Sequence, residues 1–347
     1  MHDVTVAAQP VPPEFATALR DLGLAGEREA LVGQPLTGGV SSDIWRIDTA
    51  RGPVCAKRAL PKLRVAADWR APIARNAFEA RWMQVAAQAV PGSAPRVLGQ
   101  HEALGVLAME YLDPARTALW KQLLRDGSVD VLFAQTVGDT LARIHAYAAT
   151  RPELAAQFDT DAIFFDIRLE PYLLATARKH PDLAAALQGL VAQTQANKHS
   201  LVHGDVSPKN ILVASSGSAA RPQPVLLDAE CAWWGDPAFD LAFCLNHLLL
   251  KCLWVPAARA PLLDSFDALA RAYLGRVDWE SADALERRAA ALLPGLLLAR
   301  VDGKSPVEYL GTEPQWRPVR RCASQLLRQP VSRLADVAAA WSREIES

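Results

Sequence analysis

One stretch of the chain combines residue types that could carry out phosphoryl transfer. His203-Gly204-Asp205-Val206-Ser207-Pro208-Lys209-Asn210 lies between two short apolar runs, so the pattern predicts a strand, a tight loop and a second strand. Asp205 and Asn210 stand five positions apart on this loop (210 − 205). Phosphoryl transfer uses such a pair, because a carboxylate orients or deprotonates the attacking hydroxyl while a carboxamide holds Mg²⁺ near the phosphates.

More acidic residues follow the next apolar run. Val225-Leu226-Leu227 leads into Asp228-Ala229-Glu230, which places carboxylates after a strand that we expect to pair with the strand 211–213. Asp228 is the expected metal-binding carboxylate, and Glu230 is a further candidate ligand. An ordinary turn is the alternative, because turns favour Gly, Asp and Asn. The second acidic motif favours a chemical role over a turn alone.

These motifs resemble the catalytic core of the aminoglycoside phosphotransferase and choline kinase-like superfamily, which are small-molecule kinases. The Asp228-Ala229-Glu230 motif, and Trp233-Trp234-Gly235-Asp236-Pro237 with Asp240 after it, are most similar to the methylthioribose kinase branch. The resemblance covers the chain from about Leu36 to about Leu310. It implies a mixed α/β (α+β), two-lobe protein kinase-like fold. A small N-lobe with an antiparallel sheet and a larger helical C-lobe would hold the nucleotide between them.

The expected domains follow from this resemblance. Residues 1–35 would form an N-terminal extension, residues 36–112 the N-lobe, and residues 113–347 the helical C-lobe with the catalytic and metal loops. Trp233–Pro237 is expected to be a packed loop. Apolar periodicity predicts helices over residues 14–22, 27–31, 77–89, 118–125, 129–149, 161–179, 181–196, 240–253, 259–275, 280–299 and 326–345.

Three features of the expected N-lobe point to phosphate binding. Gly38-Gly39 precedes a strand, and the backbone N–H groups of such a turn can approach phosphates closely. Lys57 lies inside the apolar strand Val54–Ala59, where its buried charge needs a partner. The resemblance implies that Lys57 binds the α- and β-phosphates of ATP. Its expected partner is Glu79 on the following helix, with Glu102 as the other candidate.

The remaining roles are also implied by the resemblance. The strand Gly105–Leu112 ends at the position of the kinase hinge, where the backbone of Glu110 and Leu112 would hydrogen-bond adenine. Asp205 would be the catalytic base, and Asp240 would brace the catalytic loop from the start of a helix. The other structural residue would be His203, and the Mg²⁺ ligands would be Asn210, Asp228 and Glu230.

The substrate stays open between a thio-sugar, an aminoglycoside, choline and another amino alcohol. The acidic motif that begins at Asp228 favours a sugar-like substrate. Candidate substrate contacts are Trp69, Arg300 and Lys304, although a docking loop or a solvated turn would also explain these residues. Arg168 lies on an expected helix and could face a substrate, but a solvent-exposed charge is the commoner alternative.

Composition narrows the choice of partner. Of 347 residues, 50% are hydrophobic and 22% are charged, as in soluble globular proteins. The net charge of −1 gives no electrostatic case for nucleic acid or an anionic membrane. Five scattered cysteines without a Cys-x-x-Cys motif argue against zinc and fit a reducing compartment. We therefore expect a cytoplasmic monomer or homodimer that acts on a small molecule.

Two functions remain. The first is an ATP- and Mg²⁺-dependent kinase that transfers the γ-phosphate to a hydroxyl of a small polar metabolite. The second is a kinase-fold nucleotide- or ligand-binding regulatory protein without turnover. A protein of the second kind would be expected to lack Lys57, Asp205 or Asp228, and this chain has all three.

Overall fold

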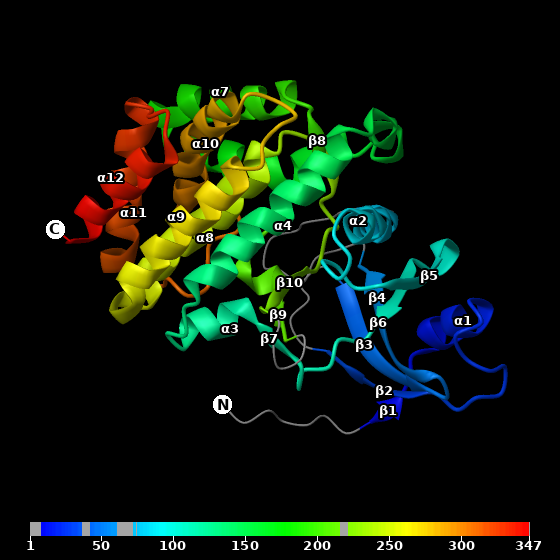
Figure 1. Ribbon diagram of the computed structural model, residues 1–347. Coiled ribbons are helices and arrows are strands. Elements are labelled where there is room, and N and C mark those ends of the chain that lie inside the picture. Colours follow the sequence, from blue (N-terminus) through cyan, green and yellow to red (C-terminus); the bar gives the residue numbers. More distant parts are fainter. Residues whose placement is uncertain (1–7, 37–41, 61–71, 74, 216–220, 347) are drawn as a thin grey trace. The chain divides into compact units, whose positions relative to one another are not determined.

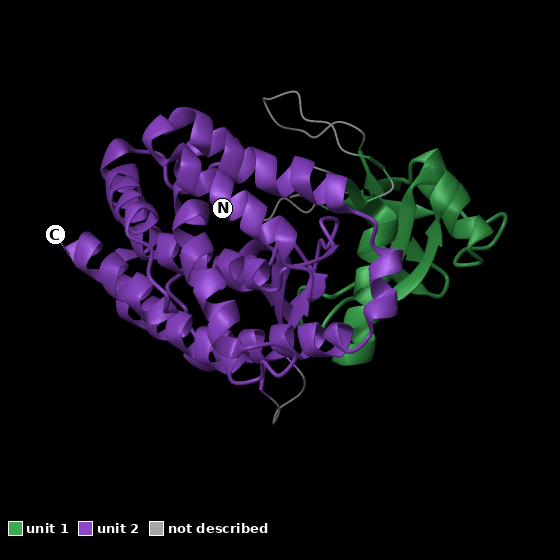
Figure 2. Cartoon of the chain, turned by 90° about the horizontal axis from the view of Figure 1, so that it is seen from above, with its two compact units in different colours: residues 1–116 green, residues 117–347 purple. Residues whose placement is uncertain are grey.

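The computed structural model describes residues 8–36, 42–60, 72–73, 75–215 and 221–346 (Figure 1). The chain divides into two compact units, Met1–Arg116 and Thr117–Ser347, which we call unit 1 and unit 2 (Figure 2). Unit 1 is built on a six-stranded sheet, whereas unit 2 is mainly helical.

Unit 1 has strand order β1-β2-β3-β4-β6-β5, and every neighbouring pair is antiparallel. The strands are β1 (Gln9–Pro10), β2 (Val32–Pro35), β3 (Ser42–Thr49), β4 (Gly52–Ala59), β5 (Val97–His101) and β6 (Val106–Glu110). The helices are α1 (Pro13–Asp21), α2 (Arg75–Ala89) and the short 3₁₀ turn η1 (Glu102–Leu104). Residues from Gln9 onward thus contribute two strands and a helix to unit 1, ahead of residue 36.

Strand β4 separates two environments. Successive side chains of a strand point to opposite faces of the sheet. Val54 and Ala56 share a hydrophobic core with Phe15 and Leu19 of α1. Lys57 comes directly after Ala56, so its side chain points to the opposite face, where α2 packs. Burial of Val54 and Ala56 on one face of β4 therefore directs the side chain of Lys57 toward the other face.

Unit 2 contains two small antiparallel sheets, β10-β9-β7 and β11-β8. Their strands are β7 (Thr117–Leu119), β8 (Ser200–Val202), β9 (Ile211–Ala214), β10 (Gln223–Leu226) and β11 (Trp233–Gly235). The predicted strand, loop and strand around Asp205 are confirmed, since β8 leads into this loop and β9 leaves it. The predicted pairing of β9 with the strand before Asp228 is also present.

Helices make up the rest of unit 2. The main α-helices are α3 (Trp120–Arg125), α4 (Val131–Ala149), α7 (Ala184–Ala196), α8 (Ala238–Trp254), α9 (Arg259–Leu274), α10 (Ala282–Asp302), α11 (Glu313–Arg328) and α12 (Leu334–Glu346). The other helical segments are η2 (Pro152–Gln157), α5 (Asp161–Phe164), the π-helical segment η3 (Phe165–Leu174), α6 (Ala175–Lys179), η4 (Pro181–Leu183), η5 (Pro208–Asn210) and η7 (Pro256–Ala258). Within the described part of the chain, no helix is long and apolar enough to cross a lipid bilayer.

Some expected elements were wrong. Residues 27–31 form a turn instead of a helix, because the Glu29 carboxylate accepts hydrogen bonds from the N–H groups of Gly26 and Ala50 and ties down two loops. Trp233–Gly235 form strand β11, so only the end of the expected loop is irregular. Helix α10 continues to Asp302 and ends before Gly303, which places Arg300 on the helix.

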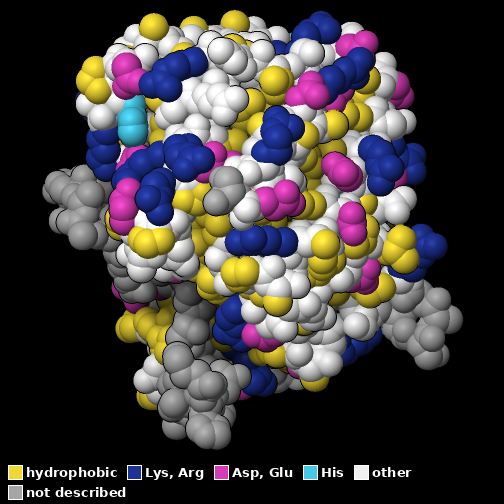
Figure 3. Space-filling model, turned by 90° about the vertical axis from the view of Figure 1, so that its left-hand side faces the viewer, with side chains coloured by type: hydrophobic (Ala, Val, Ile, Leu, Met, Phe, Trp, Pro, Cys, Tyr) yellow, Lys and Arg dark blue, Asp and Glu magenta, His cyan; other side chains and the backbone are white. Residues whose placement is uncertain are grey.

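The face of unit 2 that carries α11 and α12 mixes charges of both signs. Lys and Arg side chains are interspersed there with Asp and Glu (Figure 3). Helix α11 supplies several ion pairs, for example Arg320 with Asp302 and Arg328 with Asp182. Paired surface charges of this kind agree with the nearly neutral net charge of the chain.

Helices α4 and α9 approach each other closely at Gly138. A Cβ atom on Gly138 would lie only 2.3 Å from the backbone oxygen of Leu269. We predict that Gly138→Ala lowers the free energy of unfolding by about 1–3 kcal/mol, because the helices must move apart. Gly189→Ala on α7 is the control, since a Cβ there meets nothing within 4 Å. It should raise the free energy of unfolding by about 0.5–1 kcal/mol. Urea unfolding measures both, and equal effects would contradict the prediction.

Candidate active site

The loop after β8 needs glycine at one position. Gly204 has φ +80°, and a Cβ there would lie 2.7 Å from the backbone oxygen of Cys231. A side chain would therefore be strained by the backbone angle and blocked by its neighbour. The turn carries Asp205 into the interior, where it is only 4% exposed.

Asp240, in the first turn of α8, holds this loop. Its Oδ2 accepts a hydrogen bond from the N–H of His203 at 2.7 Å, and its Oδ1 accepts one from the N–H of Gly204 at 2.8 Å. The ring of His145 lies 3.2 Å from Oδ2 through Nε2 and contacts the hydroxyl of Tyr273 at 2.7 Å through Nδ1. Asp240 is fully buried and makes the contacts expected of a residue that braces the loop.

His203 joins the loop to the strand that precedes Asp228. The N–H of Asp205 donates to Nδ1 of His203 at 3.1 Å, so Nδ1 carries no proton. Nε2 then carries the proton and donates to the backbone oxygen of Leu227 at 3.1 Å. Burial lowers the pKa of His203 despite the nearby carboxylates, which keeps the ring in this neutral form. The imidazole is thus a fixed spacer between two backbone segments.

Two cations, from Arg168 and Lys209, face the Asp205 carboxylate. The Nη2 of Arg168 lies 3.0 Å from Oδ2, and the Nζ of Lys209 lies 3.1 Å from the same oxygen. Burial by itself would raise the pKa of Asp205. The charges of Lys209 and Arg168 outweigh that effect, so the pKa lies below its ordinary value. Asp205 is therefore ionised at neutral pH and ready to accept a hydrogen bond from a hydroxyl.

The sequence leaves Arg168 open between a residue that faces a substrate and a solvent-exposed charge. In the structure its side chain is only 9% exposed, so it is not a solvent-exposed charge. Its Nη1 donates to the backbone oxygen of Ile167 at 2.6 Å, and its Nε donates to that of Gly204. It lies on η3, and π-helical turns are often found at functional sites. The available signal was an arginine in an otherwise apolar run, Ile167-Arg168-Leu169.

The predicted metal ligands lie close to Asp205. Asn210 donates from Nδ2 to the backbone oxygen of Asp205 at 3.0 Å, which leaves its Oδ1 as the acceptor. The N–H of Leu227 donates to the backbone oxygen of Asn210 at 2.8 Å and thereby positions the next residue, Asp228. Asp228 adopts φ 65° and lies near enough to raise the pKa of Asp205. The structure thus brings together the Asp205 carboxylate, a carboxamide oxygen and a second carboxylate.

This donor set suits a hard cation such as Mg²⁺. The described residues contain no group of three or more His, Cys, Asp or Glu side chains that could hold a metal alone. Mg²⁺ does not require one, because it is usually held by one or two protein carboxylates together with substrate phosphates and water. The oxygens of Asn210 and Asp228 therefore fit Mg²⁺ in the presence of a phosphate-bearing substrate, and Glu230 lies two residues further on.

In unit 1, the predicted ion pair between Lys57 and Glu79 is present. The Nζ of Lys57 lies 2.9 Å from Oε1 and 2.8 Å from Oε2 of Glu79, and both side chains are almost fully buried. Asn76 of α2 donates to the backbone oxygens of Lys57 and Gly105, which holds α2 against the sheet. The other candidate partner, Glu102, is exposed on η1.

Comparison with known proteins identifies the family. The model of the phosphotransferase enzyme family, APH, matches residues 32–285. The chain belongs to this family. Methylthioribose kinase of Bacillus cereus (strain ATCC 14579) is 26% identical over 265 residues, covering 67% of this chain and 64% of that protein. Methylthioribose kinase 1 of Oryza sativa subsp. japonica is 23% identical over 258 residues, covering 65% of this chain and 58% of that protein. The chain thus spans less than two thirds of either relative.

Solved structures support the fold of this phosphotransferase family member. The amicoumacin kinase hAmiN aligns with a TM-score of 0.55 and 12% identity, covering 92% of this chain and 95% of that one. A Plasmodium vivax ethanolamine kinase aligns with a TM-score of 0.54 and 13% identity, covering 96% and 86%. The predicted fold class, a mixed α+β kinase-like fold with an antiparallel sheet and many helices, is confirmed.

Other residues predicted for this phosphotransferase site have varied surroundings. Gly38, Gly39 and Trp69 lie outside the described residues. The N–H of Glu110 donates to the backbone oxygen of Arg96 at 2.9 Å, so an adenine contact at Glu110 would use its carbonyl; Leu112 lies in the irregular segment after β6. Lys304 pairs with Glu170 at 2.7 Å. Arg300 is buried and contacts Tyr172.

A surface hollow of about 840 Å³ lies elsewhere in unit 2, along α4, α9 and the start of β10. None of the predicted site residues lines it. Its walls are mostly charged and polar, and they include Asp139, Arg143, Arg271 and Arg276. Asp139 pairs with Arg276 in this hollow, which is separate from the Asp205 loop.

We predict that the Asp240 carboxylate stabilises unit 2. Asp240→Asn keeps the shape of the side chain but turns one of its two acceptor atoms into a donor, so a backbone N–H of the loop loses its partner. The free energy of unfolding should fall by about 2–4 kcal/mol. Asp267→Asn, an exposed position on α9, should change it by less than about 0.5 kcal/mol. Urea unfolding tests both, and an unaffected Asp240→Asn would refute the brace.

The buried pair in unit 1 allows a second test. Lys57→Met leaves the Glu79 carboxylate buried without its counter-charge and should lower the free energy of unfolding by about 3–5 kcal/mol. The double variant Lys57→Met/Glu79→Leu replaces both charges by apolar groups and should recover most of this loss. Chemical unfolding of the two variants beside the unmodified chain gives the comparison. A double variant no more stable than the single one would contradict this view of the pair.

Proposed function

We propose that this protein is a kinase that transfers the γ-phosphate of ATP, with Mg²⁺, to a hydroxyl group of a small polar molecule. The observation that carries the proposal is the buried Asp205 carboxylate, which Lys209 and Arg168 keep ionised beside Asn210 and Asp228. Membership of the phosphotransferase family supports it, and the relatives named methylthioribose kinase favour a sugar-like acceptor.

Asp205 is the proposed catalytic base. Its ionised carboxylate accepts a hydrogen bond from the acceptor hydroxyl and orients the oxygen lone pair toward the γ-phosphorus. As the new O–P bond forms and the bond to the leaving ADP breaks, the hydroxyl proton passes to the carboxylate. Because the pKa of Asp205 is low, this transfer occurs late, and most of the rate comes from orientation and charge neutralisation.

The remaining residues hold the phosphates in this proposal. Asn210 and Asp228 would supply oxygen ligands for Mg²⁺, with Glu230 as a further ligand, and the ion when bound would supply positive charge to the phosphates. Lys57, oriented by Glu79, binds the α- and β-phosphates. Lys209 lies beside Asp205 and is 46% exposed, so it can reach an oxygen of the γ-phosphate as well. His203 and Asp240 keep the loop in place.

A kinase-fold binding protein without turnover is the second candidate function. It would use the same phosphate and metal ligands but would release ATP unchanged. Mg·ATP binding without turnover of any acceptor would support it. The two functions are separated by ADP formation, since both predict nucleotide binding.

We predict that wild-type protein forms ADP from Mg·ATP with one class of acceptor in a panel of methylthioribose, pentoses, amino alcohols, aminoglycosides and hydroxy acids. Asp205→Asn should lower kcat by about 10²–10⁴-fold, because the acceptor hydroxyl loses its base. Mg·ATP should still raise the melting temperature of this variant. Asp267→Asn is the control and should keep full activity. Undiminished turnover in Asp205→Asn would disprove the assigned role.

The double variant Lys57→Met/Glu79→Leu tests the proposed phosphate contact separately from stability. Its fold should survive, because both buried charges are removed together. If Lys57 binds the phosphates, the KM for ATP should rise by about 10–100-fold, which corresponds to the loss of one charged hydrogen bond. Steady-state kinetics at saturating acceptor gives this value, and an unchanged KM would limit Lys57 to a structural role.

A further inference from the structure

Two basic side chains of unit 2 are buried without a carboxylate partner. Lys251, on α8, is 1% exposed, and its Nζ lies 4.5 Å from the ring centroid of Trp254 and 4.4 Å from that of Tyr309. Glu308 attracts its charge from a distance, but this carboxylate is already paired with Lys121. Within the described part of the chain, Lys251 makes no ion pair.

Arg300, on α10, is the second. It is 7% exposed, and its Nη1 donates to the hydroxyl of Tyr172 at 3.1 Å and to the backbone and hydroxyl oxygens of Ser305. These acceptors are neutral. Its Nε is buried and has no hydrogen-bond partner among the residues that the structure describes. These acceptors therefore give Arg300 no counter-charge, and its Nε is left as a spare donor.

Such an arrangement is unfavourable in the free protein. A buried cation loses the solvation that water provides, and neutral acceptors or aromatic faces restore only part of it. Burial, together with the charges of Lys121 and Arg300, lowers the pKa of Lys251 to about 7. The Nε2 of His247 is buried without a partner in the same region, and the charges of Arg300 and Lys251 lower the pKa of that ring further than burial alone.

The other cations nearby are already neutralised, so these two stand apart. Lys209 and Arg168 share the Asp205 carboxylate. The remaining pairs are Lys121 with Glu308 and Lys304 with Glu170. Among the described residues of this region, Arg300 and Lys251 are thus the cations without a carboxylate partner.

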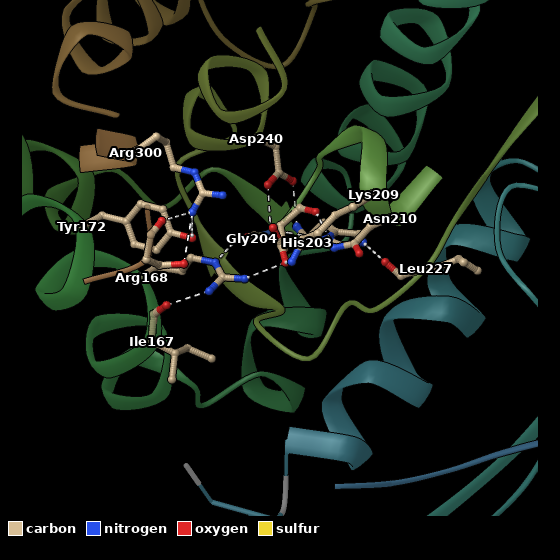
Figure 4. Close-up of polar contacts among 12 residues, drawn as sticks. Ile167, Arg168, Tyr172, His203, Gly204, Lys209, Asn210, Leu227, Asp240 and Arg300 are labelled. Carbon is tan, nitrogen blue, oxygen red and sulfur yellow. Dashed lines mark hydrogen bonds and ion pairs between the residues drawn. The ribbon is translucent and has the colours of Figure 1, made fainter. Parts of the chain in front are cut away.

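Arg300 is linked to the residues around Asp205 through the ring of Tyr172. The guanidinium of Arg300 lies 5.5 Å from the ring centroid of Tyr172, and that of Arg168 lies 5.7 Å from the same centroid. Arg168 in turn contacts Asp205. Figure 4 shows Arg300, Tyr172 and Arg168 following one another toward the loop of His203 and Gly204. A small molecule whose hydroxyl meets Asp205 can therefore carry a second group that reaches toward Arg300.

We propose that the acceptor substrate carries an oxyanion, a carboxylate or a phosphate ester, which binds to Arg300 and Lys251. The substrate class is then a hydroxy acid or a phosphorylated polyol. This inference rests on the proposed kinase function, because it places the anion on the acceptor of that reaction. It disfavours choline, other amino alcohols and aminoglycosides, whose positive charges would be repelled by both side chains.

Binding is tested first, without nucleotide and at constant ionic strength. Inorganic phosphate and glycolate are the anionic probes, and ethylene glycol is the neutral counterpart of glycolate. At least one anion should raise the melting temperature of the wild-type protein while ethylene glycol does not. Which of the two anions raises the melting temperature shows whether the site binds a phosphate or a carboxylate. No rise with either anion would overturn the proposal.

Lys251→Met then separates binding from structure. It removes a buried charge, so the free variant should melt at a higher temperature than wild type, yet the rise caused by the anion should disappear. A lysine needed only for packing would give the opposite result for the free protein. Lys179→Met, at an exposed position on α6, is the matched control and should keep the wild-type response. An anion response that persists in Lys251→Met would refute the site.

Turnover distinguishes failure of this site from failure of the kinase proposal. The paired acceptors are erythronate with erythritol, and ribose 5-phosphate with ribose, under Mg·ATP. One anion should be phosphorylated, its kcat/KM falling about 10–100-fold in Lys251→Met, mainly through KM. If the neutral acceptor were phosphorylated as efficiently as its anionic counterpart, and Lys251→Met changed neither rate, the anion site would be overturned and the kinase would stand. If an anion raised the melting temperature but Mg·ATP did not bind, the anion site would stand and the kinase proposal would be overturned.

Discussion

The organisation of unit 2 around its active-site loop depends on keeping one carboxylate ionised inside the protein. Burial alone would drive Asp205 toward its protonated form, in which it could not accept the proton of a hydroxyl. Two cations from different elements prevent this: Lys209 from η5 and Arg168 from η3. The loop must also hold its shape, which requires Gly204, the neutral ring of His203 and the carboxylate of Asp240. The charge of the proposed catalytic base is thus maintained by the residues that surround it.

Three buried cationic side chains differ in how well their charges are compensated. Lys57 has a carboxylate within 3 Å and a fixed position. Arg168 has a carboxylate and backbone carbonyls. Among the described residues, Lys251 contacts two aromatic rings and makes no ion pair, and burial lowers its pKa to about 7. A protein tolerates an uncompensated charge of this kind only at some cost in stability, so positions such as Lys251 point to a ligand more directly than well-paired ones.

Local patterns in the sequence predicted much of the fold around the candidate site. The motif from His203 to Asn210 predicted the loop between two strands, and a lysine within an apolar strand predicted the buried pair of Lys57 with Glu79. Sequence could not reveal Arg168, because its carboxylate partner is 37 residues away (205 − 168) and is reached through a π-helical turn. Nor could it separate Arg300 from Lys304, since only the true end of α10 places the first inside and pairs the second with Glu170. Contacts between residues far apart in the chain produce no pattern in the local sequence, whereas helices and strands do.

The π-helical turn of η3 has a consequence for how this site can change. In a regular α-helix, adding or removing one residue rotates the following side chains by about 100°. The wide turn around Arg168 and Pro171 incorporates such an offset. The direction of the arginine is therefore set by the number of residues in the segment as much as by their identity. Single-residue insertions or deletions here would redirect Arg168 without touching the His203–Asn210 motif, so related chains with identical motifs could differ in the charge around their catalytic carboxylate.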